Sequence, residues 1–542
     1  MNSISRWRRF AGALAALALT AIAGCGGGGA TATGSSGSSQ QPHRGGNVIF
    51  LENGDFGGFA QQDLRLWQTS SVAVNLFDRL VYVDPGSGKV EPWLATSWSV
   101  DPTFTRIELT LRTDVTFSDG SRLTPEVVKN NLDRFGVGDP KRGITPSRPQ
   151  FAAFDRAEVV GNDKVRIYLS RPDTGFLNNL GDLRHSIVAQ SALDLGYEEA
   201  SKLTNAIGSG PFVFDSEKPG TQIKIVRRAG YKWPPGSADH TGEAYLDSIT
   251  YIISSEGASR TGLLLSGQAQ AARDILITDE KKLQERGFHY FGARPFGGVR
   301  DLEINPFANK IIADVRVRQA ILHGIDQDEL IKTVYNDNWT KALGLVQSKT
   351  PGFVDSTAEY HFDAAEANRL LDEAGWTGRD RDGIRLKDGQ RLSFKVYPES
   401  QWVVPIPDVE LIAIQLARIG IKFDIVKVDR ATYTAQVAKP DNPFSWGHTT
   451  ATDVNQLWNR YRSGGAGGLN DPEFDKLLDT VNKIQVGPKR TAAVAAVQKY
   501  LLDNALIVPL QETQQSFVTA PKLQGFKPET LGRSYFYDAW LE

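Results

Sequence analysis

Strand patterns alternate with helix patterns along the chain from Asn47 to Glu542. Strands are predicted at residues 47–52, 106–112, 164–169 and 222–227, the last three from alternating apolar and polar side chains. Helices are predicted where apolar residues recur at helical spacing, in residues 124–132, 314–335, 363–375 and 409–419. Because neither period dominates, the pattern predicts α/β layers. Roughly 500 residues exceed the 250–300 or so that one core holds, so at least two domains are expected.

The first 46 residues differ in composition from the rest of the chain. Three arginines precede an apolar run at 10–23, which ends in Gly24-Cys25. This arrangement is typical of a secretory signal, here residues 1–24, and the run is too short to cross a membrane. Residues 25–46 consist mostly of Gly, Ser, Thr, Ala and Gln, which predicts a flexible tether. The pattern leaves open whether export is Sec or twin-arginine.

Cys25 is the sole cysteine, so an intrachain disulfide is impossible. The segment around it resembles a bacterial lipobox, which implies that Cys25 is acylated and becomes the mature N-terminus. Two acyl chains suffice for stable anchoring. An ordinary signal peptide with a cysteine after the cut is the alternative. The lipobox reading predicts a protein on the outer face of the plasma membrane, at the cell surface or in the periplasm, held there through its lipid alone.

The sequence lacks the motifs that are typical of catalytic and metal-binding sites. The seven histidines are scattered, and zinc-binding and nucleophile-elbow patterns do not occur. Residues 86–89 predict a hairpin turn rather than a phosphate loop, and the glycine cluster at 464–468 predicts a loop. We therefore expect no enzyme activity, no metal and no cofactor. A net charge of −2 without a long basic run makes nucleic acid an unlikely partner.

Seven segments, in order along the chain, resemble the family 5 extracellular solute-binding proteins, the dipeptide and oligopeptide binders of ABC importers. They are residues 80–98, 106–134, 207–212, 259–268, 314–331, 363–376 and 470–479. The resemblance implies a two-lobed α/β fold of the periplasmic-binding-protein type II, large peptide-binder subclass, with hinge-crossing strands and a split first lobe. It places lobe one at 47–291, with a subdomain at about 87–205, lobe two at 292–511, and a C-terminal return to lobe one at 512–542.

The resemblance also implies ligand-facing residues in both lobes. In lobe one these are Asn53, Phe56 and Phe59. In lobe two they are Gly297, Gly298, Trp402, Trp446, His448, Thr449 and Asp453. Core packing is the alternative role for the two tryptophans, since large aromatics dominate cores as well.

Two positions of lobe two depart from the peptide binders' pattern. Hydroxyl residues occupy the approximate place of an aspartate that pairs with the ligand ammonium group, and Asp453 follows Trp446 by seven residues. Asp453 either takes that role or caps the next helix. The arginine for a dipeptide carboxylate is missing from residues 398–402. A longer, capped or modified peptide therefore fits better than a strict dipeptide.

These observations predict a monomeric, non-enzymatic binding protein that delivers a peptide-like solute to ABC importer permease subunits. The same fold could instead bind an opine, a nickel chelate or an oligosaccharide. A ligand-sensing surface lipoprotein is a further alternative. A surface hydrolase is opposed by the missing nucleophile motifs.

Overall fold

The computed structural model describes residues 41–147, 150–398, 406–447, 449–454, 457–458, 461–464 and 468–542. Residues 42–542 form one compact unit. Cys25, Trp402 and His448 lie outside the described residues, as do the predicted signal and most of the predicted tether. In the part of the chain that the structure describes, the helices are too short or too polar to span a membrane.

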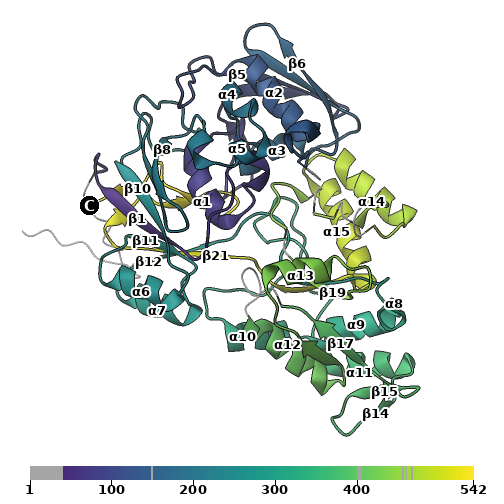
Figure 1. Cartoon of the computed structure of the whole chain (residues 1–542). Coiled ribbons are helices and arrows are strands. Elements are labelled where there is room, and N and C mark those ends of the chain that lie inside the picture. The colour runs from purple at the N-terminus through teal and green to yellow at the C-terminus, as the bar shows by residue number, and fades with distance from the viewer. Residues whose placement is uncertain are drawn as a thin grey trace, which may run out of the picture. The chain divides into compact units, whose positions relative to one another are not determined.

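Two large hydrophobic cores organise this unit. One core draws its buried residues from 48–271 and 517–539, and the other from 302–510. We refer to the parts around these cores as lobe one and lobe two. The chain enters lobe one, passes into lobe two and returns, so the first lobe is built from two separate stretches of sequence (Figure 1). The predicted lobe boundaries themselves stay predictions.

A seven-stranded mixed sheet forms the centre of lobe one, in the order β12-β21-β11-β1-β10-β9-β8. Its strands are β1 (Asn47–Glu52), β8 (Phe212–Lys218), β9 (Gln222–Arg227), β10 (Ser248–Ile253), β11 (Ala271–Arg273), β12 (His289–Ala293) and β21 (Gln515–Thr519). The buried helix α1 (Trp67–Leu76) and the helices α6 (Gly257–Leu265) and α7 (Ile277–Glu285) accompany it. β21, from the C-terminal stretch, lies between β12 and β11 and joins both ends of the chain in one sheet.

A four-stranded antiparallel sheet in the order β4-β5-β7-β6 belongs to the same lobe. Its strands are β4 (Ala95–Val100), β5 (Arg106–Leu111), β6 (Phe154–Val160) and β7 (Lys164–Leu169). Helix α2 (Pro125–Gly136) packs on it, and the Thr124 hydroxyl caps that helix by accepting from Val127 N at 3.3 Å. The predicted turn at 86–89 is confirmed, since it joins β2 (Val81–Val83) to β3 (Val90–Pro92).

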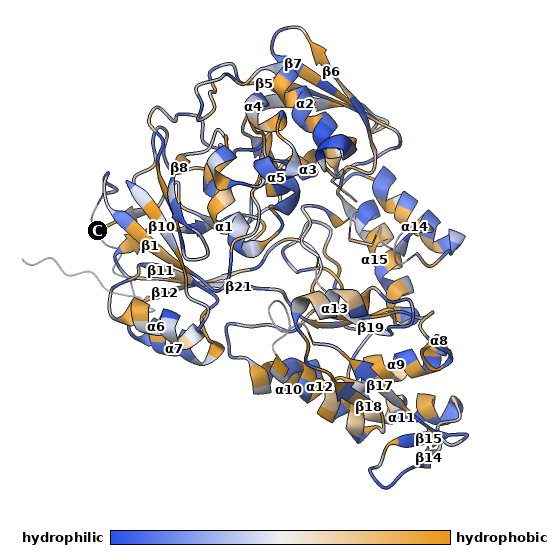
Figure 2. Cartoon of the chain, in the orientation of Figure 1, coloured by the Kyte–Doolittle hydropathy of each residue, from blue (hydrophilic) through white to orange (hydrophobic). Residues whose placement is uncertain are grey.

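Lobe two is built around the three-stranded sheet β19-β13-β20 and a set of helices. The strands are β13 (Arg300–Ile304), β19 (Phe444–Gly447) and β20 (Ile507–Gln511), and a second parallel pair is β17 (Ser393–Val396) with β18 (Lys422–Ile425). The longer helices are α9 (Val315–Gly324), α10 (Gln327–Val334), α11 (Ala364–Glu373), α12 (Ile406–Arg418), α13 (Arg430–Val437), α14 (Pro472–Lys483) and α15 (Pro488–Asp503). Figure 2 shows hydrophobic and hydrophilic residues together on helices such as α9 and α14, as expected where one face packs on a core.

One predicted helical region differs in detail from the structure. Residues 314–335 form two helices, because the chain leaves helical geometry at Ile325 and Asp326. The Asp326 carboxylate then accepts from Glu329 N at 3.0 Å and caps α10. A side chain that caps a helix start thus interrupts a continuous apolar period.

Two strand pairs connect the lobes. β12 pairs with β21 in the sheet of lobe one, and β13 pairs with β20 in the sheet of lobe two. The chain therefore crosses between the lobes at residues 294–299 and again at 512–514. Short segments of this kind between packed elements are places where a hinge between two lobes can bend.

Candidate functional site

The loop after β1 carries the lobe-one residues predicted to face a ligand. Asn53 lies at the end of β1, where its side chain donates to Asp274 at 2.5 Å and accepts from Gln68 at 2.8 Å and Arg273 at 2.6 Å. This amide therefore ties together β1, α1 and the turn after β11. That Asn53 also contacts a ligand stays a prediction.

Phe56 and Phe59 of the same loop line one pocket, which we call pocket B. Phe59 belongs to the core of lobe one and exposes 6% of its surface, whereas Phe56 is half-buried against that core. Pocket B has a volume of about 250 Å³, and its other walls come from residues 201–203 and 217–223. The structure therefore brings these two predicted residues together beside a cavity.

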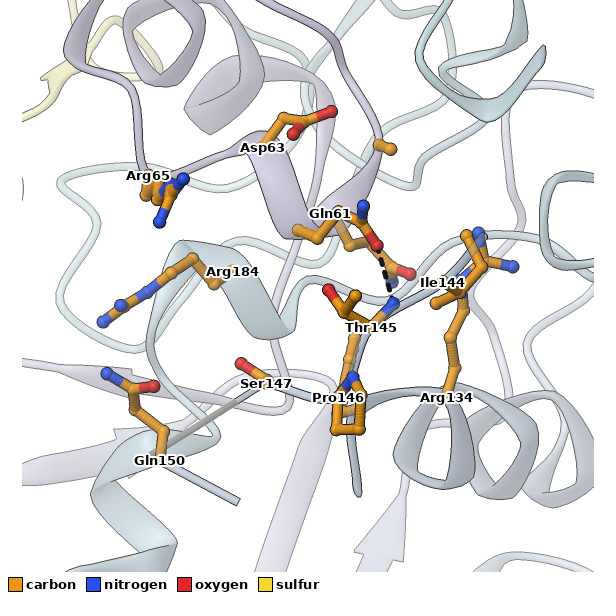
Figure 3. A pocket seen from close by; sticks show the side chains of 13 residues that line it. Gln61, Asp63, Arg65, Arg134, Ile144, Thr145, Pro146, Ser147, Gln150 and Arg184 are labelled. Carbon is orange, nitrogen blue, oxygen red and sulfur yellow. Dashed lines mark hydrogen bonds between the residues drawn. The ribbon is translucent and has the colours of Figure 1, made fainter. Parts of the chain in front are cut away.

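A second pocket, pocket A, lies next along the chain and is polar (Figure 3). Its volume is about 210 Å³. The charged and amide side chains that line it are Gln61, Gln62, Asp63, Arg65, Arg134, Gln150 and Arg184. The sequence analysis identified none of them, because they come from four segments whose proximity no local pattern records.

Hydrogen bonds hold the amide wall of pocket A in place. Gln61 Nε2 donates to Asn131 Oδ1 at 3.0 Å and to the carbonyl of Ser186 at 2.7 Å. Gln62 Oε1 accepts from Thr145 N at 3.1 Å, the contact drawn in Figure 3. These bonds tie the start of the pocket to α2 and to the segment before Gln150.

Some of the charged side chains of pocket A have a neighbouring group that offsets their charge. Arg184 donates from Nε to Asp182 Oδ1 at 2.9 Å and from Nη2 to the other carboxylate oxygen. Burial by itself would raise the pKa of Asp182, but the Arg184 charge and hydrogen bonds overcome it, and that pKa lies well below its ordinary value. Burial raises the pKa of Asp63, and hydrogen bonds from Tyr197 and Ser201 only partly offset this.

Ser147 in the pocket wall contacts His185, with Ser147 Oγ and His185 Nε2 2.8 Å apart. His185 Nδ1 lies 2.6 Å from the carbonyl of Asn179, which can only accept, so Nδ1 carries the proton and Nε2 accepts from the serine. Burial lowers the pKa of His185 to about 4. The neutral ring is fully buried against Phe135 and Phe151 and positions Ser147.

The lobe-two residues cluster where β13 begins. Gly297 pairs with Thr450 and Gly298 with Val346, while Gly298 N donates to the carbonyl of Thr449 at 2.7 Å. The structure thus brings Gly297, Gly298 and Thr449 together. Thr449 follows β19, the strand that contains Trp446.

Trp446 packs in the core of lobe two, as the packing alternative predicts. It exposes 7% of its surface, and its Nε1 donates to the carbonyl of Tyr397 at 3.1 Å. A ligand contact by this side chain stays a prediction.

Asp453 has a partner that the sequence did not suggest. Arg490 on α15 donates from Nη1 to Asp453 Oδ2 at 2.9 Å and from Nη2 to the other oxygen, and both side chains are about 1% exposed. The predicted pairing with a ligand ammonium group stays a prediction, and in this structure the carboxylate already faces a cation.

The two lobes meet near these residues. Thr452 Oγ1 donates to Asn179 Oδ1 at 3.3 Å, and Asn178 Nδ2 donates to the carbonyl of Thr452 at 3.5 Å. Asn179 Nδ2 in turn donates to the carbonyl of Gln150 at 3.1 Å. Pocket A therefore adjoins the contact between lobe one and lobe two.

Within the described ranges, groups of three or more His, Cys, Asp or Glu side chains positioned for a metal ion do not occur.

Comparisons with known proteins identify one family. The model of the bacterial extracellular solute-binding proteins, family 5 Middle, matches residues 89–468. A dipeptide-binding protein of Pseudomonas aeruginosa is 23% identical over 524 residues, covering 91% of this chain and 95% of its own length.

Two solved structures share the fold. A periplasmic binding protein of Helicobacter pylori, DppA, in complex with the peptide STSA, has a TM-score of 0.77 at 20% identity, covering 92% of this chain and 99% of its own. NikA from Brucella suis in complex with Fe(III)-EDTA has a TM-score of 0.78 at 22% identity, covering 92% of this chain and 100% of its own. These likenesses extend over both lobes and bear out the two-lobed α/β prediction.

Proposed function

The chain belongs to the bacterial extracellular solute-binding proteins of family 5, and from this we propose that it captures a peptide-like solute between its two lobes and delivers it to the permease of an ABC importer. The observation that carries the proposal is the family match over residues 89–468. Members of this family bind solutes and carry out no chemical step, so the protein is not an enzyme. A peptide is favoured as ligand because the dipeptide-binding relative aligns with 91% of the chain.

The proposed mechanism is closure of the lobes around the solute. The paired crossings at 294–299 and 512–514 permit the lobes to rotate as rigid bodies. A solute that touches both lobes only in the closed state stabilises that state, so binding shifts the population towards it. The permease would then recognise the closed form.

A ligand screen tests the proposal. Thermal unfolding of the purified full-length protein would be followed with peptides of two to ten residues, opines, oligosaccharides and nickel or iron chelates. We expect a concentration-dependent rise in Tm with peptides, because a ligand that binds only the folded state stabilises it by RT ln(1 + [L]/Kd). If peptides have no effect and a chelate, opine or sugar raises Tm, the peptide assignment fails and solute binding stands.

The lipid anchor is a separate part of the proposal. It is supported by the sequence around Cys25, the one cysteine of the chain. Cys25→Ser should release the protein from the membrane fraction of the producing cells while leaving its Tm unchanged. Retention of the variant in washed membranes would contradict lipidation at this residue.

A further inference from the structure

Positive charge exceeds negative charge among the side chains that line pocket A. Arg65, Arg134 and Arg184 line it together with the single carboxylate of Asp63. Burial raises the pKa of that carboxyl, while hydrogen bonds from Tyr197 and Ser201 and the Arg65 charge act in the opposite direction. The remaining polar walls are amides and hydroxyls, which are neutral. An anionic group entering the pocket therefore meets a net attraction.

Of the three arginines that line pocket A, Arg134 and Arg184 donate hydrogen bonds to other described residues, and Arg65 does not. Its side chain is exposed, and its charge acts on the nearby Asp63 carboxylate without a hydrogen bond between the two side chains. Arg134, in contrast, donates to the carbonyl of Leu193 at 2.8 Å. Arg65 can therefore turn to a ligand without breaking a hydrogen bond to a described residue, although its interaction with Asp63 would weaken.

Arg184 is held in position by its neighbours. Its Nε and Nη2 both donate to Asp182, which is 2% exposed and stays ionised. Figure 3 shows Arg65, Arg184 and Gln150 on the same side of the pocket. Two guanidinium groups on one wall match the acceptors of a carboxylate.

The size and position of pocket A suit one group of a larger solute. A complete small-molecule site has a volume of about 300–1,000 Å³, whereas pocket A has about 210 Å³. Through Gln150 and Asn179 the pocket adjoins Thr452 of lobe two. A group placed in it would belong to a solute that continues towards the contact between the lobes.

We propose that pocket A is a carboxylate-binding subsite, with Arg65 as the principal cation, and that the solute is an acidic peptide-like compound. The identification of the solute as peptide-like rests on the proposed function, whereas the carboxylate-binding site rests on the pocket alone.

The test uses two matched probe pairs on the full-length protein, measured by isothermal titration at low salt. The tripeptides Ala-Glu-Ala and Ala-Gln-Ala differ in one carboxylate, and so do glutarate and glutaramic acid. We expect each more anionic probe to bind about tenfold more tightly than its amide partner, the ratio that about 1.4 kcal/mol from a charge-assisted contact gives. Arg65→Gln should remove this preference, and Arg65→Lys should retain part of it.

Arg286→Gln is the control variant. Arg286 is exposed at the end of α7 and does not line pocket A, so its loss removes one positive charge from the protein and nothing from the pocket. Arg184 is a poor target, because its loss would leave Asp182 buried and unpaired. We expect Arg286→Gln to keep the tenfold preference.

The outcomes separate the subsite from the proposed function. If the tripeptides bind equally well and glutarate shows no preference, the subsite is overturned and peptide binding stands. If glutarate binds in an Arg65-dependent manner and the tripeptides do not bind, the subsite stands, and the peptide assignment is decided by the screen with longer peptides. Equal losses in Arg65→Gln and Arg286→Gln would mean a general charge effect and would overturn the role of Arg65. If none of the probes binds, the subsite is overturned, and the peptide assignment is decided by the wider ligand screen.

Discussion

Single residues show how strongly a buried charge depends on its partner. Asp453 and Arg490 expose about 1% of their side chains each and are joined by two hydrogen bonds. Removing one member of such a pair leaves an uncompensated charge in a low dielectric, which is far more costly than losing an exposed ion pair.

We expect Arg490→Met to lower the free energy of unfolding by about 3–5 kcal/mol. Urea denaturation of both proteins would measure the difference. Lys489→Met, at the exposed neighbouring position, is the control and should change stability by about 0.5 kcal/mol at most. A variant at Arg490 as stable as the control would mean that the buried pair does not contribute. By the same reasoning Asp453→Ala is expected to destabilise the protein. A ligand affinity measured on this variant must therefore be corrected for the fraction of unfolded protein.

His185 provides a residue-level prediction about pH. Its pKa is about 4 in the folded protein and 6.5 when unperturbed, so the unfolded state binds the proton first as pH falls. The stabilisation is complete above pH 6.5 and is lost as pH decreases towards 4. Between pH 7 and pH 4 we expect the wild-type protein to lose about 3 kcal/mol more stability than His185→Gln. Buried Asp78 titrates in the opposite sense in both proteins, so its effect cancels in the difference. Parallel pH profiles would show that the imidazole is not the group responsible.

At the scale of elements, the entry into β13 depends on a close approach of two backbones. Gly297 has φ of +131°, and a Cβ at this position would lie 2.1 Å from the carbonyl oxygen of Thr449. At Gly298 the nearest atom would be 3.7 Å away, which is an ordinary contact. Both glycines were predicted from the family pattern to lie near the ligand. Only at Gly297 does the backbone geometry require a glycine.

Gly297→Ala should therefore destabilise the protein by at least about 2 kcal/mol, from backbone strain and overpacking together. Gly298→Ala is the matched control and should melt near the wild-type temperature. Thermal unfolding in the absence of ligand separates the two. Similar Tm values for both variants would show that β13 adjusts its path to accommodate a side chain.

At the scale of the whole molecule, the lobes are tied by more than the two crossing segments. Glu280 on α7 of lobe one is fully buried and accepts from Asn336 at 2.9 Å, Asn338 at 3.0 Å and Trp339 at 3.3 Å, all in the loop after α10 of lobe two. One carboxylate thus connects a helix of lobe one to a loop of lobe two.

Glu280→Ala leaves these half-buried donors without their acceptor, which is expected to cost about 1–3 kcal/mol. Glu285→Ala, at the exposed end of the same helix, should cost about 0.5 kcal/mol at most. Chemical denaturation at pH 7 measures both. If the two variants are equally stable, the contact between the lobes does not hold them together in solution.

The sequence by itself determined the local elements and the class of fold. The predicted strand at 47–52 matches β1, and the predicted helix with its Thr124 cap matches α2, because periodicity and capping act between residues near one another in the chain. The order of the motifs identified the family. Ligand-facing roles came from that resemblance and stay predictions.

Only the tertiary structure decided which distant residues meet. Gln61 reaches Asn131 and Ser186 to frame pocket A, Asp453 finds Arg490, and β21 inserts between β11 and β12. Such contacts follow from the packing of whole elements, which depends on the complementary shape of two cores rather than on any local period. The positive pocket beside the lobe contact, and with it the expected acidity of the solute, could therefore be seen only in three dimensions.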